Sequence, residues 1–485
     1  MPPVLLLADS EGNDPCTSGA LKTMTPRSHP KLISRRGFLR TAAGAAALVS
    51  APLILPSRLR GAVAPSNRLR LGQIGAGRIA RGHDIPAVIA ANLGDYVAIC
   101  DLDSKRLAEG EQLIERASRD FEGPAPQLRA YGDYRELVAR DDIDAVVIST
   151  PDFSHAELAF AAIRSGKDVY LQKPMTLTLE EGILLRDAVA RYGRVFQLGS
   201  QQRSTSQFRL ACELVRSGRV GRLSRVEIGL PLDPTAPDQP EQSVPANLDY
   251  DRWLGPNPRV YYTEQRVHPQ PDYDRPGWMR NESCSLGMIS NWGAHHFDIA
   301  HWAMDVELGG PTRVEARAVF PTNKIWNVHG AYHVELLYPG SVKLTVSNEL
   351  ENGIRFFGDE GWIFVSRGEA MATASDPQGV RRSKALDASN PRLLDPKGLS
   401  VHLPRSNEQH LNFLECVRSR AVTISPAPIA HRSNTACIVS WIAMKLGRPL
   451  EWDPGAERFV NDAEADALLA RPERTPYGIR TILRA

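Results

Sequence analysis

Residues 69–80 read LRLGQIGAGRIA, and this stretch predicts the fold of the first half of the chain. Its first six residues form a run of strand length, and the next six open a helix with the pattern G-x-G-x-x-A. In that pattern Gly75 permits a tight turn, Gly77 lets the backbone approach a pyrophosphate, and the small Ala80 allows close packing of helix on strand. The stretch indicates a dinucleotide-binding unit; a glycine-bearing turn in another α/β fold is the alternative.

Asp101 ends the next predicted strand, 26 residues after Gly75. An acidic side chain at this place hydrogen-bonds the adenosine ribose hydroxyls and repels a 2′-phosphate. The sequence therefore favours NAD over NADP as the cofactor. A helix-capping role is the alternative for Asp101, because a helical pattern begins directly after it, at residue 103.

Short β-type runs alternate with helical patterns from residue 69 to residue 200. This alternation predicts a parallel sheet with crossover helices, a doubly wound Rossmann domain over residues 66–200. The predicted strands are 69–74, 96–101, 144–150, 168–172 and 195–200. The predicted helices are 78–91, 103–119, 154–166 and 178–192.

The rhythm changes after residue 220, where Val/Ile-rich strands follow one another without intervening helices. Such a run is typical of an open, mainly antiparallel sheet, so we expect a second α/β domain over residues 201–485. Residues 231–288 are rich in Pro, Tyr, Trp and Asp and lack periodicity, which is typical of a functional insertion. The predicted strands are 222–230, 313–321, 332–339, 341–349 and 354–366, and helices at 292–305, 407–419 and 430–446 are expected to cover one face.

The N-terminal 64 residues have the features of a leader. Residues 34–40 read SRRGFLR and precede an Ala-rich, uncharged run at 41–57, the pattern of a twin-arginine export signal. That run is short for a membrane helix and is broken by Pro52 and Pro56. We therefore expect the protein outside the cytoplasm, in the periplasm, with a retained N-terminal anchor as an open alternative to cleavage.

The overall composition excludes several classes of protein. The 485 residues are 42% hydrophobic, and 58 Lys and Arg nearly balance 56 Asp and Glu. Ordinary globular composition rules out a coiled coil, a collagen-like repeat or a multi-span membrane protein, and no basic excess indicates nucleic acid as a partner. The six cysteines show no metal-ligand spacing, so we expect neither a metal site nor an obligatory disulfide framework.

Two further motifs resemble the glucose–fructose oxidoreductase and inositol dehydrogenase (Gfo/Idh/MocA) family. Residues 149–182 contain Thr150-Pro151…His155 and then Gly166-Lys167…Gln172-Lys173-Pro174, similar to T-P-x-x-x-H and G-K-x-V-x-x-E-K-P. Residues 290–302, SNWGAHHFDIAHW, are similar to the family's D-x-x-x-H-x-x-D helix. The resemblance implies a nicotinamide cofactor between two domains, sugar or cyclitol substrates, homo-oligomers, and Lys173 with His295 as the catalytic pair.

The chemistry of these two side chains fits that assignment. Transfer of a hydride from an alcohol carbon requires loss of the hydroxyl proton, which a histidine can accept near neutral pH. A lysine ammonium beside the same oxygen stabilises the developing charge, while the cofactor supplies the redox chemistry. Two positions depart from the family pattern: Gln172 replaces the Glu before the lysine, and Asn291 replaces the Asp four residues before the histidine.

The candidate site residues follow from the motifs and from their places after predicted strands. The candidates for cofactor binding are Gly75, Gly77, Arg78, Ile79, Asp101, Thr150, Pro151, His155, Gln172, Lys173 and Gln201. The candidates for substrate binding are Arg203, Asn291, His296, Asp298 and Trp278, with Gln202, Tyr273 and Arg280 as further possible contacts.

Three functions are compatible with these residues. The first is an exported NAD-dependent oxidoreductase that acts on a sugar or cyclitol hydroxyl and recycles a tightly bound cofactor. The second uses the same site without net redox change, since transient oxidation of a sugar acidifies the neighbouring C–H and permits elimination, as in a glycosidase, lyase or epimerase. The third is a non-catalytic sugar-binding protein, which Lys173 and His295 disfavour.

Overall fold

The computed structural model describes residues 67–119, 127–368 and 384–484. All of them belong to one compact unit. The predicted leader, with its twin-arginine pattern, lies outside the described residues. Within the described ranges, no helix combines the length and the apolar character that a bilayer span requires.

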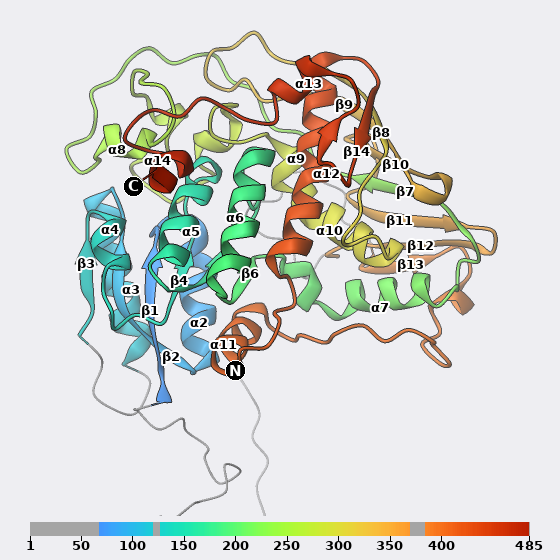
Figure 1. The fold of residues 1–485 in the computed structure, drawn as a ribbon, viewed down its shortest axis with the longest axis horizontal. Coiled ribbons are helices and arrows are strands. Elements are labelled where there is room, and N and C mark those ends of the chain that lie inside the picture. Colours follow the sequence, from blue (N-terminus) through green and yellow to red (C-terminus); the bar gives the residue numbers. More distant parts are fainter. Residues whose placement is uncertain (1–66, 120–126, 369–383, 485) are drawn as a thin grey trace, which may run out of the picture. The chain divides into compact units, whose positions relative to one another are not determined.

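The first domain contains a six-stranded parallel sheet in the order β3-β2-β1-β4-β5-β6 (Figure 1). This is the doubly wound order, with its switch point between β1 and β4, and it confirms the predicted Rossmann fold. Leu71, Val97 and Val146 are fully buried because helices cover both faces of the sheet. The strands are β1 (Leu69–Ile74), β2 (Gly94–Cys100), β3 (Arg129–Tyr131), β4 (Ala145–Ile148), β5 (Asp168–Leu171) and β6 (Phe196–Leu198).

The helix after the glycine loop differs from the continuous helix predicted over 78–91. It begins as a π-helix, η3 (Ala80–Asp84), and continues as α2 (Ile85–Ala91). Pro86 has no N–H to donate to the carbonyl of Gly82, so regular α-helical bonding is interrupted there. The remaining helices of this domain are α3 (Ser104–Ser118), α4 (Tyr134–Val138), η4 (Asp152–Ser154), α5 (His155–Arg164), α6 (Leu179–Tyr192) and η5 (Gln201–Ser204).

The second domain contains a nine-stranded sheet in the order β13-β12-β11-β7-β10-β9-β8-β14-β15. It is mainly antiparallel, as predicted, and the neighbours β7 and β10 run parallel. The strands are β7 (Leu223–Gly229), β8 (Arg313–Ala318), β9 (Tyr332–Tyr338), β10 (Val342–Ser347), β11 (Gly353–Gly358), β12 (Gly361–Val365), β13 (Leu386–Ala388), β14 (Leu450–Asp453) and β15 (Arg458–Phe459).

The single strand predicted over 354–366 is wrong, because this stretch forms the hairpin of β11 and β12. Gly358 pairs with Gly361 across a two-residue connection, Asp359-Glu360. Gly361 has φ of 133°, which a residue with a Cβ rarely adopts, and two-residue hairpin loops favour glycine and acidic residues.

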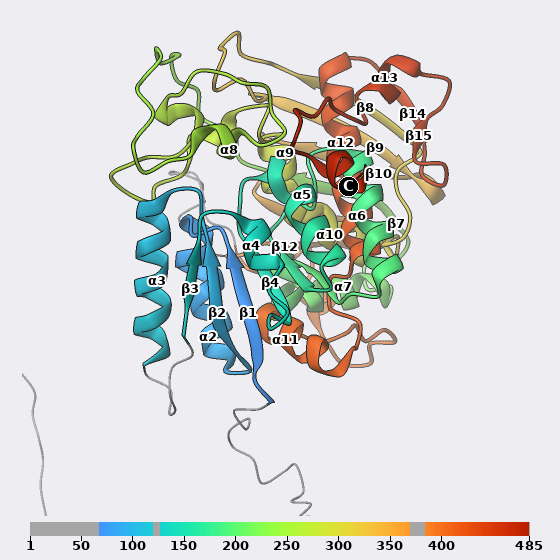
Figure 2. The same ribbon diagram turned by 60° about the vertical axis from the view of Figure 1, so that its left-hand side comes forward.

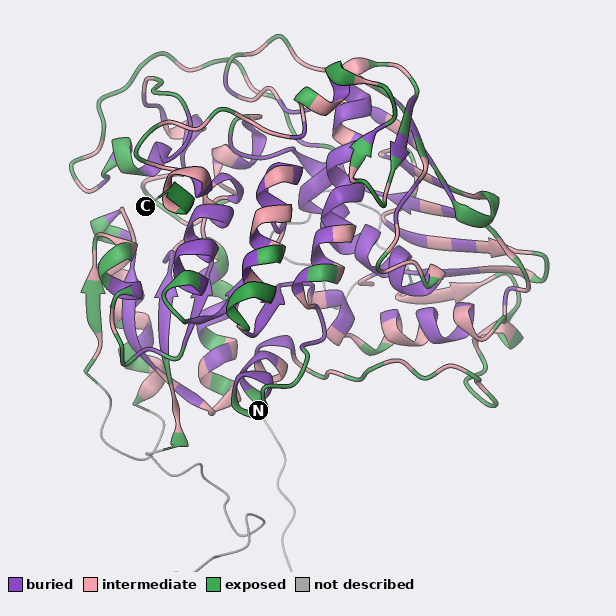
Figure 3. Cartoon of the chain, in the orientation of Figure 1, coloured by how far each residue is buried: buried purple, intermediate pink, exposed green. Residues whose placement is uncertain are grey.

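Two long helices lie at the centre of the second domain. α10 packs against α7 and α12, and α12 also contacts β8 of the second sheet and α6 of the first domain. Figure 3 shows that these helices are largely buried. The α-helices here are α7 (Ser206–Arg216), α8 (Tyr250–Leu254), α9 (Met288–Asn291), α10 (Gly293–Met304), α11 (Gln409–Ser419), α12 (Ala427–Leu446), α13 (Ala463–Ala467) and α14 (Ile479–Arg484), and the short 3-10 turns are η6 (Glu264–Arg266), η7 (Gly277–Arg280), η8 (Pro339–Ser341) and η10 (Pro391–Leu394).

The expectation that helix 407–419 covers the second sheet is wrong. This helix, α11, packs against α2 and β5 of the Rossmann domain. Its apolar residues Phe413 and Leu414 belong to one buried cluster with Leu71 and Tyr170. The amphipathic pattern of a helix shows which face is buried but not which sheet buries it.

The insertion 231–288 docks on the Rossmann domain and contains only short helical turns. Figure 2 shows it above α3. Asp103, the N-cap of α3, accepts hydrogen bonds from Asn247 Nδ2 at 2.7 Å and pairs with His268 Nε2 at 3.0 Å, and Arg106 Nη2 donates to the carbonyl of Pro269 at 2.8 Å. These contacts hold the insertion over the carboxyl edge of the parallel sheet.

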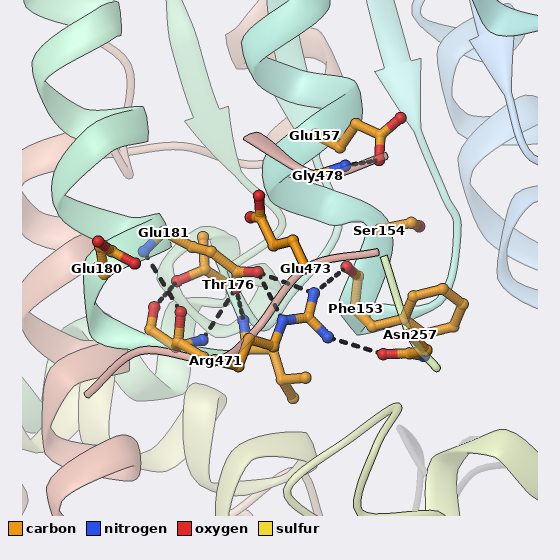
Figure 4. Close-up of polar contacts among 12 residues, drawn as sticks. Phe153, Ser154, Glu157, Thr176, Glu180, Glu181, Asn257, Arg471, Glu473 and Gly478 are labelled. Carbon is orange, nitrogen blue, oxygen red and sulfur yellow. Dashed lines mark hydrogen bonds and ion pairs between the residues drawn. The ribbon is translucent and has the colours of Figure 1, made fainter. Parts of the chain in front are cut away.

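The C-terminal segment returns to the same edge through Arg471 (Figure 4). Its guanidinium donates to Glu181 Oε1 at 2.9 Å, to Asn257 Oδ1 at 2.9 Å and to the carbonyl of Phe153 at 2.6 Å. One side chain thereby joins α6, the insertion and the loop that follows β4.

Candidate active site

A cavity of about 1070 Å³ lies between the two domains. It is at the upper end of the range of about 300–1,000 Å³ that small-molecule sites occupy, so an extended ligand fits. The glycine loop and the loops after β2, β4, β5 and β6 line one wall, and the insertion, α9 and α10 line the other. The carboxyl edge of a doubly wound sheet is where such domains bind ligands.

The glycine loop has the shape that a pyrophosphate requires. Gly75 has φ of 89°, and a Cβ there would lie 2.6 Å from the carbonyl oxygen of Ser149. A Cβ on Gly77, in contrast, would meet no atom within 4 Å, so the loop leaves open space at this position. Both glycines line the cavity, and this cradle fits a dinucleotide.

Asp101 lies at the end of β2 and lines the cavity, as its predicted role requires. Its carboxylate accepts hydrogen bonds from the backbone N–H of Ala76 at 2.7 Å and of Asp103 at 2.9 Å. Burial raises the pKa of Asp101, and these two N–H groups oppose that rise. The helix-capping role belongs to Asp103, whose side chain accepts from Lys105 N and Arg106 N; the ribose contact of Asp101 stays a prediction.

Lys173 follows β5 and reaches across the cavity to the second domain. Its Nζ donates to both the backbone oxygen and Oδ1 of Asn291, each at 3.0 Å. Burial, helped by the charge of Arg367 and opposed by that of Asp152, lowers the pKa of Lys173 to about 8. The amine is therefore protonated at neutral pH and close to releasing its proton.

His295 lies on α10 and lines the same cavity. Its Nδ1 is buried and has no hydrogen-bond partner among the described residues. Burial, then the charges of Arg367 and Lys173, hold the pKa of His295 well below its usual value. The imidazole is thus neutral at pH 7 and able to accept a proton, in the same cavity as the Lys173 ammonium, which is able to donate a hydrogen bond.

Gln172 stands where the family pattern has a glutamate, and its contacts were not predicted from the sequence. Its Nε2 donates to both oxygens of Asp84, at 2.8 and 3.0 Å, and Asp84 is fully buried. Gln172 therefore gives its amide to the Asp84 carboxylate, and the carboxylate that acts on Lys173 is Asp152. Asn291 likewise orients Lys173 through its side-chain oxygen, in place of the aspartate of the family pattern.

Restoring the family's glutamate should damage the protein. Gln172→Glu places a second carboxylate within about 3 Å of Asp84, where like charges and lost donors cost several kcal/mol in a buried site. We expect a lower melting temperature and weaker activity, measured by thermal unfolding and turnover. The double variant Gln172→Glu, Asp84→Asn should recover most of the loss in melting temperature; equal destabilisation in both variants would contradict the pairing of Gln172 with the Asp84 carboxylate.

Most of the predicted site residues line the cavity. They come from five loops of the Rossmann domain, from the insertion, from α9 and from the start of α10. The set is Gly75, Gly77, Arg78, Ile79, Asp101, Thr150, Pro151, Gln172, Lys173, Gln201, Gln202, Trp278, Asn291 and His295.

His155 does not line the cavity, so the expected cofactor contact is not supported. The side chain is fully buried, with Nδ1 2.7 Å from the carbonyl oxygen of Pro174 and Nε2 3.0 Å from that of Thr150. It ties the loop after β4 to the loop after β5. His155 thus positions the two loops that carry Thr150 and Lys173.

Three predicted substrate contacts lie in the protein interior instead. Arg203 and Asp298 form a bidentate ion pair, with Nε to Oδ2 at 2.6 Å and Nη2 to Oδ1 at 2.9 Å. His296 lies between Gln202, 3.3 Å from its Nδ1, and Asn352, 3.0 Å from its Nε2. Buried polar groups need such partners, and none of these three side chains lines the cavity.

Two further candidates from the insertion also make protein contacts. The Tyr273 ring lies between the guanidinium groups of Arg81 and Arg106, at 4.3 and 4.4 Å, and its hydroxyl bonds Glu109. Arg280 stacks on the Trp326 ring at 4.4 Å. Neither residue lines the cavity, whereas Trp278 does.

Several cavity residues were not predicted from the sequence. Asp152 follows the Thr-Pro pair directly, and its Oδ2 is buried with no partner among the described residues. Burial raises the pKa of Asp152 to about 7, against the opposing charge of Lys173. The sequence feature that could have predicted Asp152 is its place directly after the Thr150-Pro151 motif. No sequence feature predicts Glu408, because only the position of α11 brings its segment to the cavity.

This fold and site define a two-domain protein that binds a nicotinamide dinucleotide at its Rossmann domain. The chain belongs to the Gfo/Idh/MocA oxidoreductase family. Residues 69–200 match the family's NAD-binding Rossmann fold, and residues 236–364 and 384–479 match its C-terminal alpha/beta domain.

Individual relatives extend the comparison. The chain is 29% identical over 205 residues to a glycosyl hydrolase family 109 protein of Shewanella pealeana, covering 39% of this chain and 44% of that relative. It is similar in structure to aldose-aldose oxidoreductase from Caulobacter crescentus, solved with glycerol (17% identity, 79% and 99% coverage, TM-score 0.58). It is also similar in structure to the WlbA dehydrogenase from Bordetella pertussis, solved with NADH and UDP-GlcNAcA (18% identity, 80% and 99% coverage, TM-score 0.56).

Proposed function

We propose that the protein is an exported NAD-dependent oxidoreductase that transfers a hydride between a tightly bound nicotinamide cofactor and a hydroxyl of a sugar or cyclitol. The observation that carries the proposal is that Lys173 and His295, from different domains, line one cavity with the glycine loop. The relatives solved with glycerol, or with NADH and a sugar nucleotide, support a polyhydroxylated substrate.

The residues of this chain divide the chemistry between them. When bound, the cofactor supplies the hydride-accepting ring. The glycine loop and Asp101 hold its phosphates and ribose, and the Lys173 ammonium donates a hydrogen bond to the reacting oxygen of the sugar. His295, neutral because it is buried, accepts the hydroxyl proton.

Export and cofactor retention belong to the same proposal. An exported enzyme has no free nicotinamide pool to draw on, so its cofactor must cross the membrane bound and be recycled by a second substrate. The insertion, which docks over the carboxyl edge through His268 and Pro269, supports such retention. We also propose that the open nine-stranded sheet joins copies of the chain in a homo-oligomer.

Native protein recovered from the extracytoplasmic fraction should carry nicotinamide through gel filtration, at near one equivalent per chain. Mass spectrometry of the small molecules released on denaturation checks this. The matched variant Asp101→Ser should retain less cofactor, because it loses the carboxylate predicted to hold the ribose. Empty wild-type protein that binds NAD only weakly would contradict the proposal.

A second candidate function is a redox-neutral reaction, in which a transient keto-sugar permits cleavage of a glycoside and the hydride then returns. The relatives named glycosyl hydrolase family 109 favour it. The two candidates separate in one assay: a glycoside cleaved without added cofactor, and without lasting change in nicotinamide absorbance, identifies the redox-neutral reaction.

A further inference from the structure

A second histidine lines the cavity beside the predicted catalytic pair. His83 lies in the π-helix η3, and its side chain is 39% exposed. Its Nδ1 lies 3.0 Å from Asp84 Oδ1, and its Nε2 lies 3.4 Å from Gln201 Nε2. A positive charge on His83 would lower the pKa of His295, so the two rings lie within electrostatic reach of each other.

Asp84 is built to remain ionised although it is fully buried. It accepts hydrogen bonds from Ser149 Oγ at 2.7 Å and from Gln172 Nε2, and it pairs with His410 Nε2 at 3.1 Å. The other ring nitrogen of His410 lies 2.7 Å from Glu408 Oε1, and these two carboxylates raise the pKa of His410 to about 9. An imidazolium therefore stabilises the Asp84 charge.

This arrangement fixes the tautomer of His83. An ionised carboxylate accepts only, so Nδ1 of His83 carries a proton toward Asp84 and Nε2 presents a lone pair. In histidines that transfer protons, one ring nitrogen donates to a carboxylate that orients the ring, and the other nitrogen exchanges the proton. His295, in contrast, has no such partner at its Nδ1.

We propose that His83 is a second catalytic acid–base group, positioned by Asp84, that exchanges the proton on the carbon next to a sugar carbonyl. The inference rests on the proposed function, which creates that carbonyl at the hydroxyl carbon. The C–H proton passes to His83 Nε2, and the electron pair of that bond moves to the carbonyl oxygen, giving an enolate. Return of a proton from Nε2 to carbon restores the ketone, and no oxidant is consumed.

A metal ion is the competing interpretation of this cluster. One nitrogen of His83, one of His410 and an Asp84 oxygen lie within 4.8 Å of one another. However, both ring nitrogens of His410 face carboxylates, and both Asp84 oxygens already accept hydrogen bonds. A metal would have to displace these bonds, so the contacts favour proton transfer.

The test supplies the ketone directly, so that it does not depend on hydride transfer. Purified NAD-loaded protein is incubated in D2O with methyl 3-ketoglucoside, and deuterium at the carbons beside the carbonyl is followed by NMR. His83→Ala should slow exchange roughly 10²–10⁴-fold, the usual contribution of a general base, and added imidazole should restore part of it. The His83→Gln side chain can still donate to Asp84 but cannot take up a proton, so this variant should exchange deuterium as slowly as His83→Ala.

The matched control is His333→Ala, which removes a part-buried histidine paired with Glu335 at 3.3 Å, outside the cavity. The His333→Ala variant should incorporate deuterium at the wild-type rate. Wild-type protein without exchange, or equal exchange in His83→Ala, would overturn the inference, as would a stoichiometric metal whose removal stops exchange. Failure of the proposed function shows separately, as absence of nicotinamide reduction by any sugar.

Discussion

Lys173→Met should lower kcat roughly 10²–10³-fold, the effect of removing one hydrogen-bond donor from a developing oxyanion. The side chain keeps its length and its packing but loses the ammonium that donates to Asn291 and, in our proposal, to the substrate oxygen. Steady-state rates on the best sugar substrate, with the cofactor content of each preparation, measure the effect. Cofactor content should change much less than kcat.

The control for this prediction is Lys343→Met, since Lys343 pairs with Glu335 on the second sheet and is 49% exposed. It should leave kcat unchanged. The pH profile gives an independent check: burial lowers the pKa of Lys173 to about 8, so the ammonium and the activity should be lost as the pH rises through that value. A Lys173→Met enzyme with wild-type kcat would remove this residue from the mechanism.

Arg203→Met should lower the free energy of unfolding by about 3–5 kcal/mol, the cost of leaving a buried carboxylate without its partner. Both Arg203 and Asp298 are almost fully buried, and their bidentate contact joins the turn after β6 to α10. Urea or thermal unfolding of the purified variant measures the change. The sequence predicted a substrate contact for both residues, and the structure gives them this role instead.

An exposed ion pair provides the matched control. Arg222 lies 3.7 Å from Asp359, and the two side chains are 85% and 60% exposed. Arg222→Met should change stability by less than about 1 kcal/mol, because water screens such pairs. If Arg203→Met instead kept full stability and raised only KM, that result would support the predicted substrate contact and contradict the structural role.

The predicted elements of the Rossmann domain agree well with the structure, because local signals define them. Apolar runs of strand length became β1, β4 and β5, and Thr178 with Glu181 forms the capping box that begins α6. The short strand β3 carried no such signal, since its residues are largely exposed. The predicted packing partner of α11 was wrong, because hydrophobic periodicity identifies the buried face of a helix but not the sheet that it packs against.

The candidate site was predicted in part. Gly75, Gly77 and Lys173 line the cavity, as expected of residues that directly follow parallel strands. His155 and Asp298 do not, because a motif gives the position of a residue but not the direction of its side chain. His83 went unnoticed, since the His410 that pairs with its neighbour Asp84 is distant in sequence, and only the packing of α11 brings His410 to this place.

Local sequence patterns are enough to predict the architecture: a glycine loop after a strand, alternating strands and helices, and then an antiparallel sheet. These follow from backbone conformation and hydrophobic periodicity, which act over a few residues. Which polar groups meet, such as Lys173 with Asn291 and Arg203 with Asp298, depends on the packing of the whole chain. Such pairs form because burial makes an unpartnered charge costly, and burial depends on how distant segments pack.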